Sequence, residues 1–350
     1  MRSRTGTVLG TVFAVLGVLL LAAAAILYWW VVPSNAQLPA DTNTTRQYEG
    51  TVKQLLNAQA LGAGDTARAI VRDIPATATR VVKVLATDGN VAQVSETNTL
   101  MAAGQTVGQT QAVYALDRKT MENPGNHPAD WKVINQQGLT VTFPIGSKQQ
   151  DYTGWYNESQ ISAPLKYVRE EQHGGVDTYV YEGAAPASPI KDPQVLATLP
   201  QTLPVSALAT ASAILPIPDS LKSQLATLLP RLTAPVPLSY TFESTGTYWV
   251  EPTSGVVVDS KVEDIRKATV GLPGGVSIPG ITVYDVVVQN TTQSVNDAAS
   301  EASNDRNKIV WYGQTLPLIF LIAGAVLLIG GVLLIVFSRR RGTTRAEVSS

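Results

Sequence analysis

The chain has no cysteine and only two histidines among its 350 residues. An exported domain without cysteine has no disulfide bonds, so a hydrophobic core must hold it together. The sequence also has no HExxH or CxxC spacing, which are the usual patterns of zinc ligands. We therefore assign no metal and no cofactor, and we expect a large, well-packed sheet rather than a small disulfide-linked scaffold.

Catalytic motifs are scarce as well. There is no GxSxG motif and no glycine-rich, phosphate-binding loop ahead of a helix. Glu170-Glu171 and Glu263-Asp264 are adjacent pairs, and neighbours in a strand point to opposite faces. Asp259 and Glu263 share a face and keep a glycan-cleaving enzyme open as an alternative. We expect a protein that is not an enzyme and assign no catalytic residue.

Charge is missing from two long stretches. Leu316 to Phe337 has no charged residue, and as a helix it would be about 33 Å long, enough to cross a bilayer core of roughly 30 Å. Val8 to Val32 is similarly apolar and exceeds the ~7–15 residues of a signal-peptide core. Trp29 and Trp30 close it at the depth where aromatic rings prefer lipid headgroups. We predict uncleaved membrane helices at 8–32 and 316–337.

The arginines beside these helices predict the topology. They lie in the short segments 1–7 and 338–350, and basic residues mark the cytoplasmic side of a membrane. Residues 33–315 hold 20 basic and 26 acidic residues, whereas the other segments hold six arginines and one glutamate. We predict a two-pass plasma-membrane protein with both termini inside and 33–315 outside, and no nucleic-acid partner. The topology residues are Arg2, Arg4, Arg339, Arg340 and Arg341.

The segment between the helices has the pattern of antiparallel strands. Residues 80–87 and 91–100 are rich in β-branched side chains and flank Asp88-Gly89-Asn90, a typical hairpin turn. A second hairpin is predicted around His173-Gly174-Gly175. Long strand patterns return after residue 237. Many strands at hairpin spacing favour a nearly closed sheet, because closure removes exposed edges. The predicted fold is mainly β, an extracytoplasmic antiparallel barrel-like domain between two membrane helices.

Residues 183–237 differ in composition and predict a helical insertion. Prolines recur between apolar stretches, and Asp219-Ser220 can cap a short helix whose leucines share one face. This helix either closes one end of the core or forms an apolar flap that contacts the membrane or gates a cavity.

Aromatic residues recur in or beside the predicted strands. They belong either to an ordinary core or to the apolar wall of a ligand cavity, since larger barrels enclose such cavities. Our candidate cavity-lining residues are Trp131, Phe143, Trp155, Tyr156, Tyr179, Tyr181, Phe242 and Trp249.

Three stretches resemble a known family. They are the segment from Tyr248 to Asp259, the motif Thr142-Phe-Pro-Ile145 with Tyr152 and Trp155 after it, and Asp117-Arg-Lys-Thr120. They are similar to actinobacterial two-pass membrane proteins described as PorA-like, over nearly the whole chain. The resemblance implies an extracytoplasmic β-barrel with apolar cavities and a part in making lipomannan and lipoarabinomannan. It carries over no catalytic residue, and Asn157 stands where the family often has an acidic residue.

Our first functional hypothesis is a non-enzymatic protein that binds a membrane lipid or lipid-linked glycan in an apolar cavity and supports lipoglycan biosynthesis. The second is a two-pass scaffold or regulator of a membrane glycosyltransferase. A glycan-acting enzyme and a pore are the remaining alternatives. The absence of catalytic constellations and the recurrent strand aromatics favour the first hypothesis.

Overall fold

The structure is a computed structural model that describes residues 2–31, 36–214, 219–275 and 277–343. The chain forms two compact units. One unit contains Met1–Gln37 and Ser303–Ser350, and the other contains Leu38–Ala302. Each unit is described by itself below.

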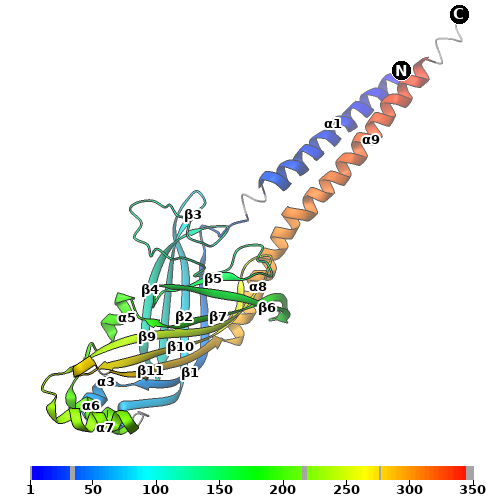
Figure 1. The fold of residues 1–350 in the computed structure, drawn as a ribbon. Helices are drawn as coiled ribbons and strands as arrows, with labels where there is room; N and C mark the ends of the chain where they lie inside the picture. The colour runs from blue at the N-terminus through cyan, green and yellow to red at the C-terminus, as the bar shows by residue number, and fades with distance from the viewer. Residues whose placement is uncertain (1, 32–35, 215–218, 276, 344–350) are drawn as a thin grey trace, which may run out of the picture. The chain divides into compact units, whose positions relative to one another are not determined.

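The unit Leu38–Ala302 is built on one antiparallel sheet that curls on itself (Figure 1). Its strand order is β4-β3-β2-β1-β11-β10-β9-β7-β6-β5, and the short strand β8 pairs with β9. The predicted mainly β, antiparallel domain is thereby confirmed. The strands are β1 (Asn43–Leu56), β2 (Ile70–Asp88), β3 (Val91–Ala102), β4 (Gln105–Asp117), β5 (Tyr152–Tyr156), β6 (Ile161–His173), β7 (Val176–Pro189), β8 (Thr202–Leu203), β9 (Val236–Val250), β10 (Val257–Gly271) and β11 (Ser277–Asn290).

Both predicted hairpins are present. Asp88 pairs with Val91 across the β2–β3 turn, and His173 pairs with Val176 across the β6–β7 turn. Along β3 the alternating residues Ala92 and Val94 are fully buried, as expected of a strand with one face toward a core. β2 begins ten residues earlier than the predicted strand 80–87, because residues 70–79 also pair with β1.

Small helices gather at one end of the sheet (Figure 1). Their apolar residues pack with the ends of β8, β9, β10 and β11, and Leu225 is almost fully buried there. The leucine-rich helix of the proline-rich insertion therefore closes one end of the core. The side chain of Leu221, which was predicted on the same helix face, lies outside the described residues. The helices are α3 (Ala58–Gly62), α4 (Thr66–Ala69), α6 (Val205–Ile214), α7 (Asp219–Leu228) and the 3-10 turns Leu229–Arg231 and Pro273–Gly275.

The edge strands β4 and β5 are joined by a segment of the long loop between them. Ile134 bridges to Tyr114 of β4, and Leu139 bridges to Gly154 of β5. The backbone N–H of Leu139 donates to Thr153 at 2.8 Å, and the N–H of Trp155 donates back to Leu139 at 2.9 Å. Leu139 forms an isolated bridge rather than part of a strand, because the chain crosses the gap between the two edges instead of extending either one.

Gly138 lets this segment approach β5 closely. Its φ is +136°, and an added Cβ would lie 2.6 Å from the carbonyl oxygen of Thr153. Any side chain would separate the segment from the strand. Gln136, which is fully buried, donates its amide to the carbonyl of Ala115 on β4 at 2.6 Å. The loop between Ile134 and Leu139 thus satisfies backbone groups on both edges of the sheet.

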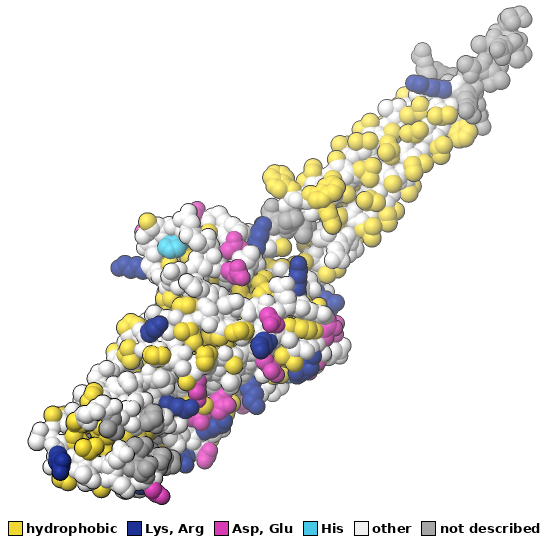
Figure 2. Space-filling model, in the orientation of Figure 1, with side chains coloured by type: hydrophobic (Ala, Val, Ile, Leu, Met, Phe, Trp, Pro, Cys, Tyr) yellow, Lys and Arg dark blue, Asp and Glu magenta, His cyan; other side chains and the backbone are white. Residues whose placement is uncertain are grey.

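The other unit holds two long apolar helices. They are α1 (Arg2–Ile26), which runs into a π-helical turn (Leu27–Val31), and α9 (Leu316–Thr343), which follows the π-helical turn Trp311–Thr315. Both helices are long and apolar enough to cross a membrane. Only 17% and 11% of their most apolar windows are buried, so they are not core helices of a globular domain. Figure 2 shows hydrophobic side chains along their exposed surface.

α1 and α9 pack against each other in antiparallel orientation through small residues. Every seventh residue is buried on each helix, namely Gly10, Gly17 and Ala24 on α1 and Pro317, Gly324 and Gly331 on α9. A Cβ added at Gly17 would lie 2.6 Å from the carbonyl oxygen of Gly324. Without a hydrophobic driving force inside a bilayer, helices associate through such close backbone contact.

We expect Gly324→Ile to weaken this helix pair. The new Cβ would lie 2.9 Å from the Gly17 carbonyl oxygen, and such overpacking costs about 1–3 kcal/mol. The measurement is the thermal unfolding of the full chain in detergent. Gly330→Ile is the matched control, because no heavy atom lies within 4 Å of a Cβ at Gly330. Equal melting temperatures for the two variants would contradict the observed packing.

Candidate functional site

The curled sheet forms a partly open cavity of about 350 Å³. This volume lies within the range of small-molecule sites, which is about 300–1,000 Å³. The wall is partly apolar, with side chains such as Phe143, Phe242 and Val286, and partly charged. The charged residues of the wall are Arg80, Glu96, Glu158, Asp192, Asp264 and Arg266.

Strand alternation sets which residues of β10 reach the cavity. Val262, Asp264 and Arg266 line it, whereas the intervening Lys261 and Glu263 line a hollow on the other face of the sheet. That outer hollow is lined largely by small residues of β7 and β9, among them Gly183, Ala184 and Gly246. The cavity inside the curled sheet combines apolar side chains with buried charged groups, and it is the better candidate for a functional site.

Each arginine in the cavity wall is paired with a glutamate. The Arg80 Nε atom lies 2.6 Å from the Glu96 carboxylate, and its Nη2 atom donates to the Val141 carbonyl at 3.0 Å. Arg266 donates two hydrogen bonds to Glu158, at 2.8 and 2.5 Å. Its guanidinium group also lies 4.2 Å from the centre of the Tyr284 ring. Buried charges need such partners, because removing them from water is costly.

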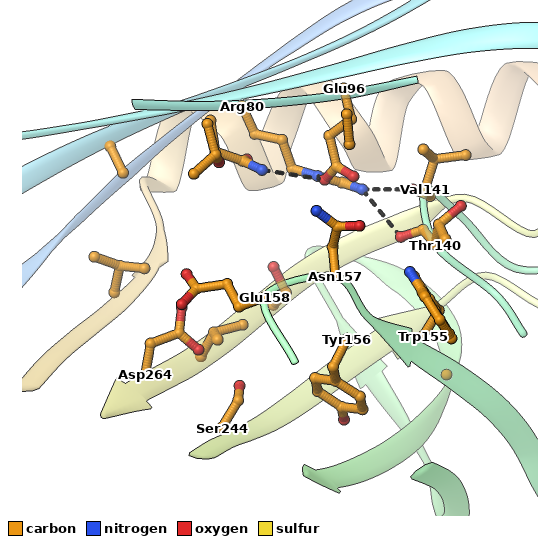
Figure 3. A pocket seen from close by; sticks show the side chains of 18 of the residues that line it. Arg80, Glu96, Thr140, Val141, Trp155, Tyr156, Asn157, Glu158, Ser244 and Asp264 are labelled. Atoms are coloured by element: carbon orange, nitrogen blue, oxygen red, sulfur yellow. Dashed lines mark hydrogen bonds and ion pairs between the residues drawn. The ribbon is translucent and has the colours of Figure 1, made fainter. Parts of the chain in front are cut away.

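Asp264 is in a different position. None of the ion pairs among the described residues includes it. Burial raises the pKa of its carboxyl to about 6, and the negative charge of Glu158 adds to the effect. A hydrogen bond from Ser244 acts in the opposite direction. Figure 3 shows Glu158 and Asp264 across the cavity from the Arg80–Glu96 pair.

Several polar side-chain atoms at the cavity have no hydrogen-bond partner among the described residues. They are Thr140 Oγ1, Trp155 Nε1, Tyr156 OH and Asn157 Oδ1. Three of them belong to consecutive residues at the end of β5 (Figure 3). Burial raises the pKa of the Tyr156 hydroxyl to about 12, so it remains protonated at neutral pH and can donate a hydrogen bond.

A short helix, α5 (Pro193–Thr198), covers part of the β4 edge next to the cavity. Asp192 caps this helix, accepting from the N–H of Gln194 at 2.8 Å, and also accepts from the Asn157 amide at 2.7 Å. The Gln194 side chain donates to the carbonyl of Gln111 at 2.9 Å and accepts from its N–H at 3.3 Å. A side-chain amide thereby takes the place of a pairing strand at this edge.

The structure separates the candidate aromatics into two groups. Phe143, Trp155, Tyr156 and Phe242 line the cavity. The other four lie elsewhere. Tyr181 is fully buried and packs with Phe143 and Tyr179 in a core cluster. The Trp131 ring is stacked with that of His127, with ring centres 6.4 Å apart, and Trp249 is stacked on His173.

The charged residues of the cavity were not among the predicted site residues. Their only sequence signal is the period of two, which puts Asp264 and Arg266 on the same strand face as the apolar Val262 and Ala268. A charged residue on a core-facing row is a sign of a buried polar site. Arg80 and Glu96 lie on different strands, and their pairing follows from the β2–β3 register.

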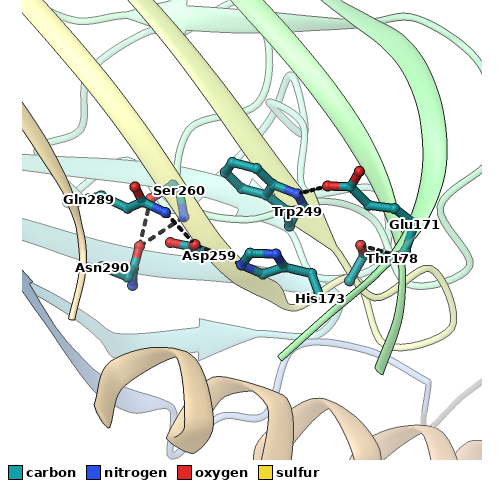
Figure 4. Close-up of polar contacts among 8 residues, drawn as sticks. All are labelled: Glu171, His173, Thr178, Trp249, Asp259, Ser260, Gln289 and Asn290. Carbon is teal, nitrogen blue, oxygen red and sulfur yellow. Dashed lines mark hydrogen bonds and ion pairs between the residues drawn. The ribbon is translucent and has the colours of Figure 1, made fainter. Parts of the chain in front are cut away.

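A second polar cluster lies around His173 and Trp249 (Figure 4). The His173 Nε2 atom is 2.8 Å from the Asp259 carboxylate, which also accepts from Gln289 at 2.8 Å. The ring centres of His173 and Trp249 are 4.7 Å apart, and Trp249 Nε1 donates to Glu171. Glu263, the other half of the carboxylate pair considered above, instead binds Lys53. The two acids therefore have separate sets of partners.

The fold and site define a protein with two candidate membrane helices and a curled antiparallel sheet that forms a partly charged cavity. The chain belongs to the porin PorA family, whose model matches residues 9–333. This is consistent with an envelope-associated protein anchored by its two apolar helices. No curated protein matches the chain. A crystal structure of an acyl-CoA thioesterase II, TesB2, from Mycobacterium marinum is 10% identical over 71% of this chain and 80% of that one, with a TM-score of 0.12.

We expect Asp264→Asn to stabilise the protein at pH 7–8 and to have little effect below pH 4. The folded carboxyl holds its proton more tightly than the unfolded one, so the ionised form destabilises the fold above pH 6 and is neutralised as the pH falls toward 4. A rise in pKa from 3.8 to about 6 corresponds to about 3 kcal/mol. The measurement is the free energy of unfolding against pH, with Asp130→Asn at an exposed site as control. A pH-independent difference would contradict this account.

Proposed function

We propose that this protein is a membrane-anchored, non-enzymatic binding protein of the cell envelope. Its extracytoplasmic sheet domain holds a lipid or lipid-linked glycan in the internal cavity, in support of lipoglycan biosynthesis such as that of lipomannan and lipoarabinomannan. The observation that supports the proposal is the partly open cavity of about 350 Å³, whose wall is apolar in part and polar in part. Such a wall suits an amphiphile.

The apolar helices support the anchoring. The basic residues beside them favour cytoplasmic ends for both helices, and the antiparallel pairing of α1 and α9 is the arrangement that a two-pass protein needs. The matched glycines of the pair also favour retention of α1. A signal sequence that is removed has no need of small residues placed opposite those of a distant helix, as Gly17 is placed opposite Gly324.

Burying an acyl chain in the cavity is favourable compared with leaving it exposed to water. Burial of apolar groups contributes about 0.8 kcal/mol per methylene, and the wall offers Leu100, Phe242 and Val286 among its apolar side chains. The cavity is too small for a whole diacyl lipid, so we propose that it holds one end of the molecule.

The family name suggests a pore, but the physical properties of the sheet argue against one formed by its strands. A transmembrane barrel needs an apolar outer band about 25 Å tall. The outward faces of β1 and β10 instead carry Lys53, Lys261 and Glu263. Figure 2 shows charged side chains over the visible surface of the sheet domain.

The proposed topology predicts the labelling of introduced cysteines, because the native chain has none. A cysteine at the exposed Ala187 should react with an impermeant maleimide on intact cells. A cysteine at Ser349 should react only after the cells are permeabilised. The reverse pattern would contradict an outward-facing sheet domain.

Ligand retention tests the function itself. Native mass spectrometry of the full chain, released from lipid nanodiscs, should detect a bound lipid. Gly108→Phe should reduce retention by about fivefold or more, corresponding to about 1 kcal/mol. Position 108 lines the cavity, and a Cβ there meets only Leu100, at 4.0 Å.

The matched control is Gly62→Phe, at an exposed position with no heavy atom within 4 Å of a Cβ. It should retain lipid as the wild type does. A wild-type chain that carries no lipid but constantly co-purifies with a glycosyltransferase would overturn the binding proposal in favour of a scaffold.

A further inference from the structure

The wall of the cavity is closed unevenly around the sheet. Small helices cover one end of the sheet, and a buried core cluster that includes Met121, Phe143 and Val250 fills the space toward the other end. Residues 134–139 bridge β4 to β5. The first part of β4, residues 105–110, pairs with β3 on one side and with no described strand on the other. This stretch is therefore the least closed part of the wall.

Both sides of the gap beside β4 belong to the cavity wall. Gly108 and Thr110 of β4 line the cavity on one side, and Glu158 and Asp192 line it on the other. The N–H of Asp192 donates to the Glu158 carbonyl at 3.0 Å, and Asp192 caps α5, which lies beside β4 (Figure 1). We call the gap between residues 105–111 of β4 and α5 the seam.

α5 is held firmly on the side away from β4. Val195 is buried in a core cluster with Tyr240 of β9, and the Tyr240 hydroxyl donates to the carbonyl of Pro200 at 2.6 Å. The Gln201 amide donates to two carbonyl groups at the C-terminal end of the helix, both at 3.0 Å. These contacts fix α5 to the wall formed by β9, so any opening of the seam must separate α5 from β4.

The contact across the seam is much weaker. Of the residues that the structure describes, Gln194 alone joins α5 to β4 by hydrogen bonds, one to the carbonyl and one from the N–H of Gln111. Both residues are exposed to solvent. Water can replace exposed hydrogen bonds at little cost, and local opening begins where such bonds hold an edge without buried apolar contacts. The seam is therefore the part of the wall that opens most easily.

We infer that the seam is the entrance of the cavity and that Gln194 acts as its gate. When its two bonds to Gln111 break, β4 separates from α5 and a ligand passes between them. When the bonds form again, the ligand is retained. The inference rests on the proposed function only for the identity of the ligand as a lipid, because the opening is a property of the wall itself.

The first test measures opening without following any lipid. Val286 of β11 lines the cavity and is buried. Val286→Cys therefore gives the full chain, purified in detergent, a single thiol that a small methanethiosulfonate reagent reaches by way of the cavity. In this background Gln194→Ala should raise the labelling rate about fivefold, because the two bonds that close the seam are lost.

Gln201→Ala is the matched control. It removes two side-chain hydrogen bonds from the same helix without changing any contact with β4. Labelling at position 286 should therefore keep the rate of the parent. Equal rates in the Gln194→Ala and Gln201→Ala variants would mean that the seam is not the entrance.

A second reporter separates local opening from unfolding of the whole domain. Val258→Cys places the thiol at a fully buried position outside the cavity wall. Gln194→Ala should leave the labelling rate at this position unchanged. Equal acceleration at positions 258 and 286 would show that the substitution only destabilises the domain, and the inference would be overturned.

The last test follows exchange of a bound lipid. The full chain with bound dioleoylphosphatidylcholine is mixed with an excess of the deuterated lipid in detergent micelles, and native mass spectrometry records the replacement over time. Gln194→Ala should speed exchange about fivefold and leave the amount bound at equilibrium within about twofold of the wild type, since Gln194 is not part of the cavity wall.

The outcomes distinguish the entrance from the proposed function. Unchanged exchange in Gln194→Ala would overturn the gate and leave lipid binding intact. If the wild type binds no lipid, the proposed function fails, and labelling at position 286 alone decides on the entrance. Faster labelling in Gln194→Ala but not in Gln201→Ala would then still support the seam as the entrance.

Discussion

The fold depends on satisfying the backbone groups of two sheet edges that do not meet. Edge strands expose rows of N–H and C=O groups that would otherwise pair with another chain. Here β4 and β5 are bridged by the loop segment between Ile134 and Leu139, with Gly138 at the closest approach and Gln136 buried against β4. Gln194 extends the closure along β4. Without these contacts the sheet would open, and the space inside it would be part of the solvent.

The curling of the sheet also explains why the arginines of the cavity wall are paired with glutamates. A polar residue on an inward row leaves water when the sheet curls, and it must then find a partner within the wall. Arg80 and Arg266 do so with Glu96 and Glu158, which come from different strands or loops. Breaking one partner of such a pair is strongly destabilising, at about 3–5 kcal/mol. One pair therefore stabilises each side of the cavity, while Asp264 has no ion-pair partner among the described residues and accepts a hydrogen bond from Ser244.

Local signals in the sequence were enough for most of the fold. Three features depend only on neighbouring residues and could therefore be predicted from the sequence. They are the turn at Gly89, the alternation along β3 and the two uncharged stretches. The bridge at Leu139 could not, because it depends on the whole sheet curling until its two edges, β4 and β5, lie near each other. The same limit applies to the site. Aromatic Phe143 and Phe242 could be proposed from strand position, but the pairing of Arg266 with Glu158 depends on a contact across 108 residues.

The register of β1 and β11 brings the two chain ends of the sheet domain together. Tyr48 near the start of the domain pairs with Asn290 near its end, and the N–H of Thr291 donates to Gln47. The chain therefore begins and ends this domain on adjacent strands and at the same end of the sheet. An antiparallel pair of helices also presents two chain ends side by side. This pairing of β1 with β11 joins the first strand of the sheet to its last in chain order, so it places the two halves of the strand order side by side.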